Sequence, residues 1–312
     1  MTRYREICAD LARRISAGTL QPGDELPGVR DLARQWQTTA STVSRAQRRL
    51  ADAGVLELAD RRRARVAPGA ALAARRFLYG DRVFTLAGSD DPALDLVAGA
   101  LDGRLRVITG EGSVAGLGAV RQGRADGATI HLLHRTGSYN APFARGMLRG
   151  LDPHLIHLWR REQGLIVPPG NPMGITGIAD LAGRRVCARR PGTGTRILLD
   201  RLLLAAGLDP DRLRGPEAGT HLEVALAVAT GTVDAGLGVR SAAADLDLDF
   251  IPLAWEDFDI GVTGEALGAA AHLVAALRTP ELRARIAALG GYDTSRSGDV
   301  TRLTAAAPSA AS

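Results

Sequence analysis

Residues 26–50, LPGVRDLARQWQTTASTVSRAQRRL, decide the fold of the N-terminal part of the chain. Two short helical patterns lie in this stretch, and the polar residues 37–40 separate them. In the first pattern, Leu32, Ala33 and Trp36 recur at the spacing of one buried helix face. Two helices joined by a short polar turn indicate a helix-turn-helix.

The second helix of the stretch is expected to begin at Ser41, whose hydroxyl is a suitable N-cap. Its apolar residues Val43, Ala46 and Leu50 predict a buried stripe. The opposite face is polar and cationic, and consists of Thr42, Ser44, Arg45, Arg48 and Arg49. Such a helix fits the DNA major groove, where an arginine can donate two hydrogen bonds to guanine.

The flanking sequence completes this unit. Upstream, Ile7, Leu11 and Ile15 follow helical spacing until a turn at residues 21–24. Downstream, two short apolar runs flank residues 60–63, which predicts a hairpin with an arginine tip. Together these elements form an α+β winged helix-turn-helix, and we expect a double-stranded DNA operator as its partner. The expected DNA-binding residues are Arg30, Ser41, Thr42, Ser44, Arg45, Arg48, Arg61, Arg62 and Arg63.

Charge is unevenly distributed along the 312 residues. All 39 positively charged residues are arginines, so a pyridoxal Schiff base on this chain and a lysine-containing P-loop are both excluded. Up to Leu78, 15 arginines face eight acidic residues, a net charge of +7, whereas the rest of the chain carries 24 arginines and 26 acidic residues, a net charge of −2. A basic unit joined to a near-neutral one indicates that the first meets a polyanion.

The run from Tyr4 to Leu58 closely resembles the GntR-type winged helix of bacterial transcription regulators. It departs from the family at residues 37–40, where the family usually has a Val-Ser-Arg-type segment. The resemblance implies DNA binding by a homodimer, because regulators of this type usually read palindromic operators.

In the second part of the chain, strand patterns alternate with helical ones, which predicts an α/β domain built on parallel strands. Expected strands at residues 83–87, 105–109 and 127–132 are each followed by small polar residues. Ligands of such sheets bind at the carboxyl ends of strands, near helix N-termini that attract anions. The expected ligand-binding residues are Ser89, Asp90, Ser113, Tyr139, Asn140, Thr193, Thr195 and Arg196.

Several segments between residues 86 and 260, such as RRPGTGTRILLD and HLEVALAVATGTVDAGLGV, resemble a periplasmic-binding-protein-like domain. This domain is similar to molybdate-binding and LysR-type effector folds. The resemblance implies a type II fold of two α/β lobes that close on a small ligand. It also implies that the chain crosses between lobes near residues 161–163 and returns near residues 238–243.

The sequence leaves the chemistry of the ligand open. Neutral donors and Arg196 favour an anion, either a molybdate- or tungstate-like oxyanion or a small organic acid. The carboxylate of Asp90 would repel an oxyanion, so the ligand could instead be zwitterionic, or Asp90 could cap a helix. Glu256 and Asp257 are interpreted as capping or surface residues.

Two histidine pairs, His131 with His134 and His154 with His157, have a spacing that suits a metal on a helix. Both fall in strand-like runs, where residues three apart lie on opposite faces, so no metal and no cofactor are expected. The chain has no apolar leader and no long apolar run, which predicts a cytoplasmic protein without membrane contact.

We therefore expect a ligand-responsive transcription regulator and not an enzyme. The alternative is a hydrolase or transferase fused to a winged helix, but no nucleophile elbow or triad pattern supports it. The expected domains are a winged helix at 1–68, a linker at 69–80, a ligand domain at 81–302 and a disordered tail at 303–312.

Overall fold

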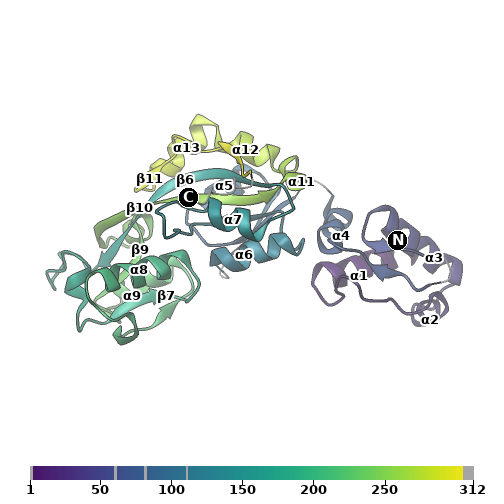
Figure 1. Ribbon diagram of the computed structural model, residues 1–312, viewed down its shortest axis with the longest axis horizontal. Coiled ribbons are helices and arrows are strands. Elements are labelled where there is room, and N and C mark those ends of the chain that lie inside the picture. Colours follow the sequence, from purple (N-terminus) through teal and green to yellow (C-terminus); the bar gives the residue numbers. More distant parts are fainter. Residues whose placement is uncertain (1–2, 60–61, 81–82, 110–111, 305–312) are drawn as a thin grey trace, which may run out of the picture. The chain divides into compact units, whose positions relative to one another are not determined.

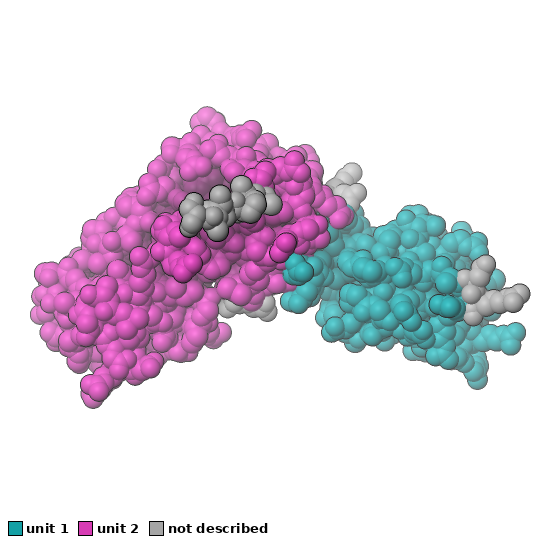
Figure 2. All heavy atoms as spheres, viewed as in Figure 1, with its two compact units in different colours: residues 1–84, 121–126 teal, residues 85–120, 127–312 magenta. Residues whose placement is uncertain are grey.

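The computed structural model describes residues 3–59, 62–80, 83–109 and 112–304. The chain divides into two compact units (Figure 2), the first comprising residues 1–84 with 121–126 and the second residues 85–120 with 127–312. Within the described residues, no helix is both long and apolar enough to cross a bilayer.

The first unit packs helices around one apolar core and adds a two-stranded hairpin. Its fully buried side chains include Ile7, Leu11, Val43 and Leu50, which come from the predicted helical stripes. In the hairpin, the strands are antiparallel and Leu56 lies opposite Val66. The elements are α1 (Arg3–Ser16), α2 (Val29–Gln35), α3 (Ala40–Asp52), β1 (Leu56–Glu57), β2 (Arg65–Val66) and α4 (Ala70–Tyr79) (Figure 1). The predicted winged helix-turn-helix is confirmed.

The N-cap of α3 is Thr39, and the prediction of Ser41 was wrong. Thr39 Oγ1 accepts a hydrogen bond from the backbone N–H of Thr42 at 3.3 Å. Ser41 already lies in the first turn, with its hydroxyl 3.0 Å from that of Thr39. The sequence places several residues able to cap next to one another, and helical spacing alone does not select among them.

The segment interpreted as a linker contains α4. Ala70 and Ala74 of this helix are fully buried in the core of the first unit. Arg75 donates a hydrogen bond to the carbonyl of Gly123 at 3.1 Å, which ties the helix to residues 121–126. The domain limits at 68, 80 and 302 stay predictions, and residues 305–312 of the predicted tail lie outside the described residues.

The second unit is built on one long mixed sheet, with the strand order β4-β3-β5-β10-β6-β9-β7-β8 and with β11 and β12 added beside β6. One end of this sheet, with its helices, forms the first lobe. Its elements are β3 (Phe84–Gly88), α5 (Leu94–Ala100), β4 (Leu105–Thr109), α6 (Gly112–Arg121), β5 (Gly127–Ile130), α7 (Ala141–Met147), α11 (Gly264–Leu267), α12 (Ala271–Leu277), α13 (Pro280–Ala287), β11 (Tyr292–Asp293) and β12 (Val300–Arg302).

The other end of the sheet forms the second lobe, in which β7 lies parallel to both β8 and β9. Its core contains Leu165, Leu199, Val224 and Leu237. Its elements are β7 (Val186–Arg189), α8 (Gly194–Ala205), β8 (Glu217–Ala218), α9 (His221–Ala229), β9 (Ala235–Val239) and α10 (Arg240–Ala244), with short 3₁₀ turns at Ile178–Leu181 and Pro210–Arg212. The predicted α/β fold is thereby confirmed.

Two long antiparallel strands, β6 (Pro153–Val167) and β10 (Asp249–Thr263), run through both lobes. Their register shifts twice, between Pro252 and Ala254 and again between Phe258 and Asp259. Such irregularities bend and twist a strand pair, and here they bracket the passage between lobes. The chain returns on β10, and not near residues 238–243 as the resemblance implied, because β9 is an inner strand of the second lobe.

Candidate DNA-binding face and ligand-binding cleft

Helix α3 presents its predicted DNA-binding residues on the side away from its core stripe. Ser41, Arg45 and Arg48 are exposed, and Thr42 and Ser44 are half-buried. The Arg45 guanidinium lies 4.3 Å from the centre of the Tyr4 ring, a cation–π contact. The α1 helix therefore supports the orientation of this arginine.

Other predicted DNA-binding residues lie on α2 and on the hairpin. Arg30 is exposed in the first turn of α2, and Arg62 and Arg63 are exposed between β1 and β2. Arg61 lies outside the described residues. The assignment of these residues to DNA contacts stays a prediction.

In the first lobe of the second unit, the hydroxyls of two predicted ligand-binding residues lie close together. Ser89 follows β3 and Ser113 lies in the first turn of α6, and their buried Oγ atoms are 2.8 Å apart. Ser113 Oγ also accepts the backbone N–H of His131 at 3.2 Å. Helix α6 can pack this closely because a Cβ at Gly116 would lie only 2.7 Å from Gly88 Cα.

The second lobe brings the N-terminus of α8 to the same place. Its first residue, Gly194, has no room for a side chain, since a Cβ would lie 2.4 Å from the carbonyl oxygen of His131 in the first lobe. The N-cap Thr193 and the first-turn Thr195 are both buried, and Thr195 accepts a hydrogen bond from Gln163 at 3.2 Å. The residues after β5 and the start of α8 therefore lie against each other where the two lobes meet. This buried region between the lobes is called the cleft below.

The floor of the cleft is Arg161, which lies on β6 where the chain passes between lobes. It is fully buried, and its guanidinium donates to Asp91 Oδ2 at 2.6 Å, to Glu256 Oε1 at 2.7 Å and to the carbonyl of Asp90 at 3.1 Å. Its carbon Cζ lies 4.2 Å from the centre of the Phe258 ring. Burial acts to lower the pKa of Arg161, but the carboxylates of Glu256 and Asp91 raise it, so the group stays charged.

Glu256 collects further donors in addition to Arg161. Gln163 Nε2 donates to its Oε1 at 2.7 Å, and His131 Nδ1 lies 3.1 Å from its Oε2. Burial acts to raise the pKa of Glu256, but His131 and Arg161 lower it to about 2. Burial lowers the pKa of His131, which makes the neutral imidazole the form that donates to an ionised Glu256.

Asp90 connects the two lobes. It follows β3 in the first lobe, and its Oδ1 lies 2.5 Å from Arg189 Nη2 at the end of β7. Its Oδ2 accepts the backbone N–H of His221, the first residue of α9, at 3.2 Å. Asp90 therefore contacts the N-terminal end of a helix of the opposite lobe, whose N-cap is Thr220.

Five buried polar atoms of this region have no hydrogen-bond partner in the described structure. They are Arg161 Nη2, Arg189 Nε, Gln163 Oε1 and both ring nitrogens of His221. Burial lowers the pKa of His221 well below its ordinary value, so its ring is neutral and offers one donor and one acceptor. Buried polar groups are nearly always paired with protein groups or ordered water, so this group of unpaired atoms makes the cleft the candidate ligand-binding site.

Three other residues that were predicted to bind the ligand, Asn140, Tyr139 and Arg196, have different surroundings. Asn140 is saturated, because it donates to Asp259 and to the carbonyl of Asp257 and accepts the N–H of Leu132. Tyr139 is half-buried, and burial raises the pKa of its hydroxyl.

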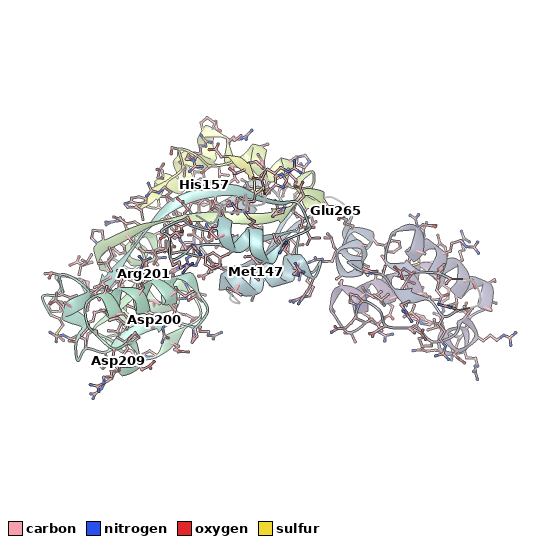
Figure 3. All side chains as sticks on the ribbon, in the orientation of Figure 1. Met147, His157, Asp200, Arg201, Asp209 and Glu265 are labelled. Carbon is pink, nitrogen blue, oxygen red and sulfur yellow. The ribbon has the colours of Figure 1, made fainter. Side chains whose placement is uncertain are left out.

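The guanidinium of Arg196 makes none of the side-chain contacts described above for the cleft. Its guanidinium donates to Asp200 Oδ1 at 2.8 Å along its own helix and to Glu217 Oε1 at 3.2 Å. Figure 3 labels Asp200 on α8. Arg196 is thus held by carboxylates of the second lobe.

Sequence reasoning missed the central residues of the cleft. Arg161, Arg189, His221 and Gln163 were not among the expected ligand residues, and the interpretation of Glu256 as a surface residue was wrong, since it is 2% exposed. One signal was available: four consecutive polar residues, Arg-Arg-Glu-Gln at 160–163, interrupt the largely apolar run that forms β6. Charged residues inside buried strands are rare unless they are paired.

Within the described residues, no group of three or more His, Cys, Asp or Glu side chains could hold a metal ion. His131 contacts Glu256, and His157 Nδ1 lies 2.7 Å from Asp259 Oδ1 (His157 is labelled in Figure 3). His131 and His157 thus each pair with a different carboxylate.

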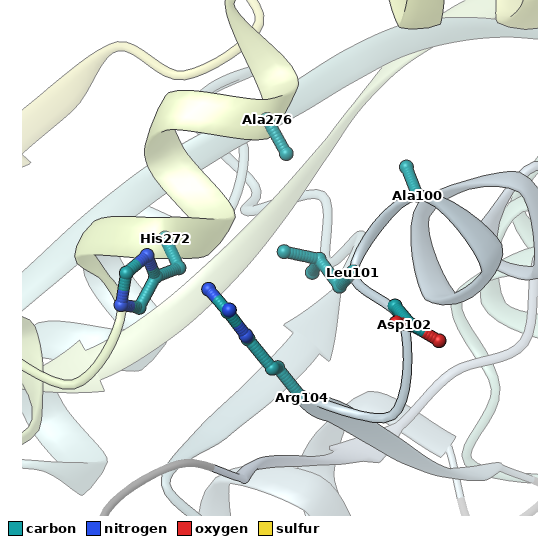
Figure 4. Close-up of a pocket in the computed structure, with 6 residues that line it drawn as sticks. All are labelled: Ala100, Leu101, Asp102, Arg104, His272 and Ala276. Atoms are coloured by element: carbon teal, nitrogen blue, oxygen red, sulfur yellow. The ribbon is translucent and has the colours of Figure 1, made fainter.

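A surface hollow of about 300 Å³ lies between the end of α5 and α12 (Figure 4). Arg104 and His272 reach into it from opposite sides, and both are exposed. This hollow contains none of the buried unpartnered atoms of the cleft.

The fold and cleft define the second unit as a two-lobed α/β domain of the binding-protein class. The chain belongs to the PBP superfamily, because residues 96–278, more than half of its length, match the PBP superfamily domain. Residues 3–66 match the gntR family of bacterial regulatory proteins. Both resemblances seen in the sequence are confirmed.

The chain is 35% identical over 195 residues to the uncharacterized protein YvgK of Bacillus subtilis, a match that covers 61% of this chain and 63% of that protein. It is 49% identical over 47 residues to an HTH-type transcriptional regulator of Mycobacterium tuberculosis, covering 15% of this chain and 39% of the regulator. The chain thus spans less than two thirds of the length of either relative.

Two solved structures are similar in fold. The tungstate ABC transporter from Geobacter sulfurreducens has a TM-score of 0.48 at 18% identity, covering 64% of this chain and 95% of that one. The OxyR C206 mutant of Corynebacterium glutamicum has a TM-score of 0.48 at 14% identity, covering 82% of this chain and 88% of that one.

Proposed function

We propose that the protein is a DNA-binding transcription regulator whose second unit binds a small ligand and thereby changes its affinity for operator DNA. The observation that carries this proposal is the set of unpartnered polar atoms buried in the cleft, on the same chain as a GntR-type winged helix. Each unpartnered buried group costs about 1 to 3 kcal/mol. A ligand that pairs them would stabilise the closed lobes.

The cationic face of α3 and the hairpin arginines support the DNA-binding half of the proposal. Arg45 and Arg48 are exposed on the helix that this class of protein inserts into the major groove. Arg62 and Arg63 are available for phosphate contacts, which make affinity depend strongly on salt. We further propose that the protein binds DNA as a homodimer, since two-fold symmetry matches a palindromic operator.

The donors of the cleft support a small ligand with an anionic group, such as a molybdate- or tungstate-like oxyanion or an organic acid. Among the described residues, Arg161 Nη2 and Arg189 Nε are buried donors without an acceptor, and the hydroxyls of Ser89 and Ser113 lie in the facing wall. Binding and release of such a ligand require no catalytic group, so the proposed role is regulation and not catalysis.

The test uses the full chain and a fluorescein-labelled duplex obtained by in vitro selection with it. Anisotropy titrations are run at several salt concentrations, with and without molybdate, tungstate, sulfate, amino acids or small organic acids. We expect nanomolar, salt-dependent binding that at least one of these probes changes by fivefold or more, the range of ordinary allosteric coupling. A duplex affinity that no probe changes would contradict the proposed regulation.

Assembly is tested separately. Light scattering of the full chain with the selected duplex is expected to give two protein chains per duplex. A mass of one chain, with and without DNA, would contradict the homodimer.

A further inference from the structure

We propose that the ligand of the cleft is a zwitterion, a small molecule with a carboxylate and an ammonium group such as an amino acid, and not a bare oxyanion. This inference rests on the proposed ligand-binding function and narrows its chemistry. Three features carry it: the charge balance of the cleft, the mixture of unpartnered donors and acceptors, and an acidic cavity that Asp90 and Asp91 also line.

The charge balance of the cleft is already negative without a ligand. Arg161 and Arg189 supply two positive charges, whereas Asp90, Asp91 and Glu256 supply three negative ones. A dianion would bring the sum from −1 to −3 in a buried site, where like charges repel more strongly than in water. A zwitterion would leave the sum unchanged.

Asp91 accepts hydrogen bonds from three groups. Asp91 is fully buried and accepts from Arg161, from the backbone N–H of Ala93 at 2.8 Å and from the hydroxyl of Tyr292 at 3.0 Å. Burial raises the pKa of Asp91, and Arg161 opposes that shift. Even a protonated Asp91 would leave the sum at zero, which still favours a ligand without net charge.

Each helix start near the cleft already has one of its N–H groups paired with a side chain. The backbone N–H of His221, at the start of α9, donates to Asp90. At the start of α8, Thr193 Oγ1 accepts the backbone N–H of Arg196 at 3.3 Å. These contacts use some of the donors that would otherwise attract an oxyanion.

The unpartnered atoms require a ligand with both acceptors and donors. Arg161 Nη2 and Arg189 Nε need acceptors, which a carboxylate provides, but Gln163 Oε1 needs a donor. The orientation of the Gln163 amide is fixed, because its nitrogen faces Glu256 Oε1 at 2.7 Å and an oxygen there would meet another acceptor. A bare oxyanion would leave Gln163 Oε1 unpaired, whereas an ammonium group would donate to it.

A cavity of about 420 Å³ has Asp90 and Asp91 in its wall, and its other lining residues come from both lobes. All of its charged lining residues are acidic: Asp90, Asp91, Asp95 and Asp245. Its apolar lining includes Leu94, Leu96 and Leu222. None of the described residues with unpartnered atoms lines this cavity, so it adds negative charge beside the cleft without supplying contacts to those atoms. That added negative charge disfavours an anion.

The experiment measures ligand binding to the full chain by thermal shift and isothermal titration. The probes are the common amino acids, the 2-hydroxy acids with the same carbon skeletons, and molybdate, tungstate, sulfate and phosphate. We expect at least one amino acid to bind tenfold or more tightly than its hydroxy analogue and than every oxyanion. The inference is overturned if no amino acid binds, or if an oxyanion or hydroxy acid binds as tightly as the best amino acid.

The two proposals fail differently. An oxyanion that binds and shifts DNA affinity would contradict the proposal of a zwitterionic ligand but would support the proposed regulatory function. If no probe shifts DNA affinity, the proposed regulatory function is contradicted. The binding measurements alone then decide whether the ligand is a zwitterion.

Asp90→Asn gives a second test whose two readouts move in opposite directions. Removing this negative charge should lower the affinity for the amino acid at least fivefold and raise the affinity for sulfate or molybdate. A general structural defect would weaken both, so parallel losses would overturn the inference. Asp211→Asn, an exposed carboxylate in the second lobe, is the matched control and should leave both affinities unchanged.

Gln163→Met covers the case in which Asp90→Asn does not fold. It keeps the length of the side chain and removes the unpartnered acceptor. We expect the preference for an amino acid over its hydroxy analogue to fall at least threefold, and an unchanged preference would count against the zwitterion.

Discussion

Helix α3 and the crossing strands β6 and β10 use arginine in different ways. Arg45 is exposed and stacks on the Tyr4 ring, whereas Arg161 is fully buried and holds two carboxylates. Water solvates an exposed cation, so Arg45 can remain unpaired until a phosphate or base arrives. A buried cation must be paired within the fold, so Arg161 is tied to stability as well as to ligand binding.

The largest expected effect tests the buried side of this comparison. Arg161→Met would leave Asp91 and Glu256 buried without their cation, and we expect a loss of about 3 to 5 kcal/mol in the free energy of unfolding. Urea denaturation followed by circular dichroism measures it. Arg160→Met is the control, because Arg160 is exposed and its contact with Asp257 is 3.5 Å long, so its loss should stay below about 1 kcal/mol. Equal losses in the two variants would break the comparison.

The exposed side of the comparison predicts an effect on DNA and none on folding. Arg45→Ala should weaken binding to the selected duplex by about 1 to 3 kcal/mol if Arg45 contacts a base, while the unfolding free energy changes by less than about 0.5 kcal/mol. Arg13→Ala, an exposed arginine on α1, controls for net charge. Anisotropy titration with wild-type affinity for Arg45→Ala would remove this residue from the interface.

A pH titration sharpens the comparison, because buried groups respond to it through folding. The pKa of His221 is lowered in the folded state, so the unfolded chain binds more protons and stability falls as the pH drops below about 6.5. The slope for this group is at most about 1.4 kcal/mol per pH unit. His221→Gln should reduce the slope, whereas His272→Gln, at an exposed histidine, should not. Urea midpoints between pH 8 and pH 5 give the slopes, and identical slopes in wild type and His221→Gln would refute the assignment.

The smallest expected effect concerns Arg196, which the sequence placed in the cleft and the structure pairs with Asp200 and Glu217. We expect Arg196→Ala to change the affinity for the best probe by less than threefold. The loss of partly exposed ion pairs should cost less than about 1 kcal/mol of stability. Isothermal titration decides whether Arg196 binds the ligand or only forms ion pairs within the second lobe. A tenfold loss of ligand affinity in Arg196→Ala would show that Arg196 contributes to ligand binding.

The sequence by itself determined the winged helix of the first unit, whereas the packing of α4 into the same core was found only in the structure. Its apolar stripes, which include Ile7, Leu11, Val43 and Leu50, pack into the core as the helical spacing predicts. The residues of α3 that face solvent lie outside this apolar stripe, as the same periodicity predicts. Interactions within some 60 residues decide this fold, so local spacing carries the information. The choice of Thr39 over Ser41 as the cap is the kind of detail that spacing does not resolve.

In the second unit, the sequence determined the alternation of strands and helices and placed Ser89, Ser113, Thr193 and Thr195 at the ends of strands and starts of helices, where the structure buries them beside one cleft. These residues were accessible to prediction because each belongs to a local turn.

Only the tertiary structure decided the chemistry at the bottom of that cleft. Asp91, Arg161 and Glu256 are up to 165 positions apart in the sequence, and the register of β6 against β10 sets Arg161 opposite Glu256. No local pattern encodes that pairing, because a shift of one residue would turn these side chains to the other face of the sheet. The burial that makes these charges interact strongly, and leaves five polar atoms for a ligand to pair, exists only once both lobes have formed.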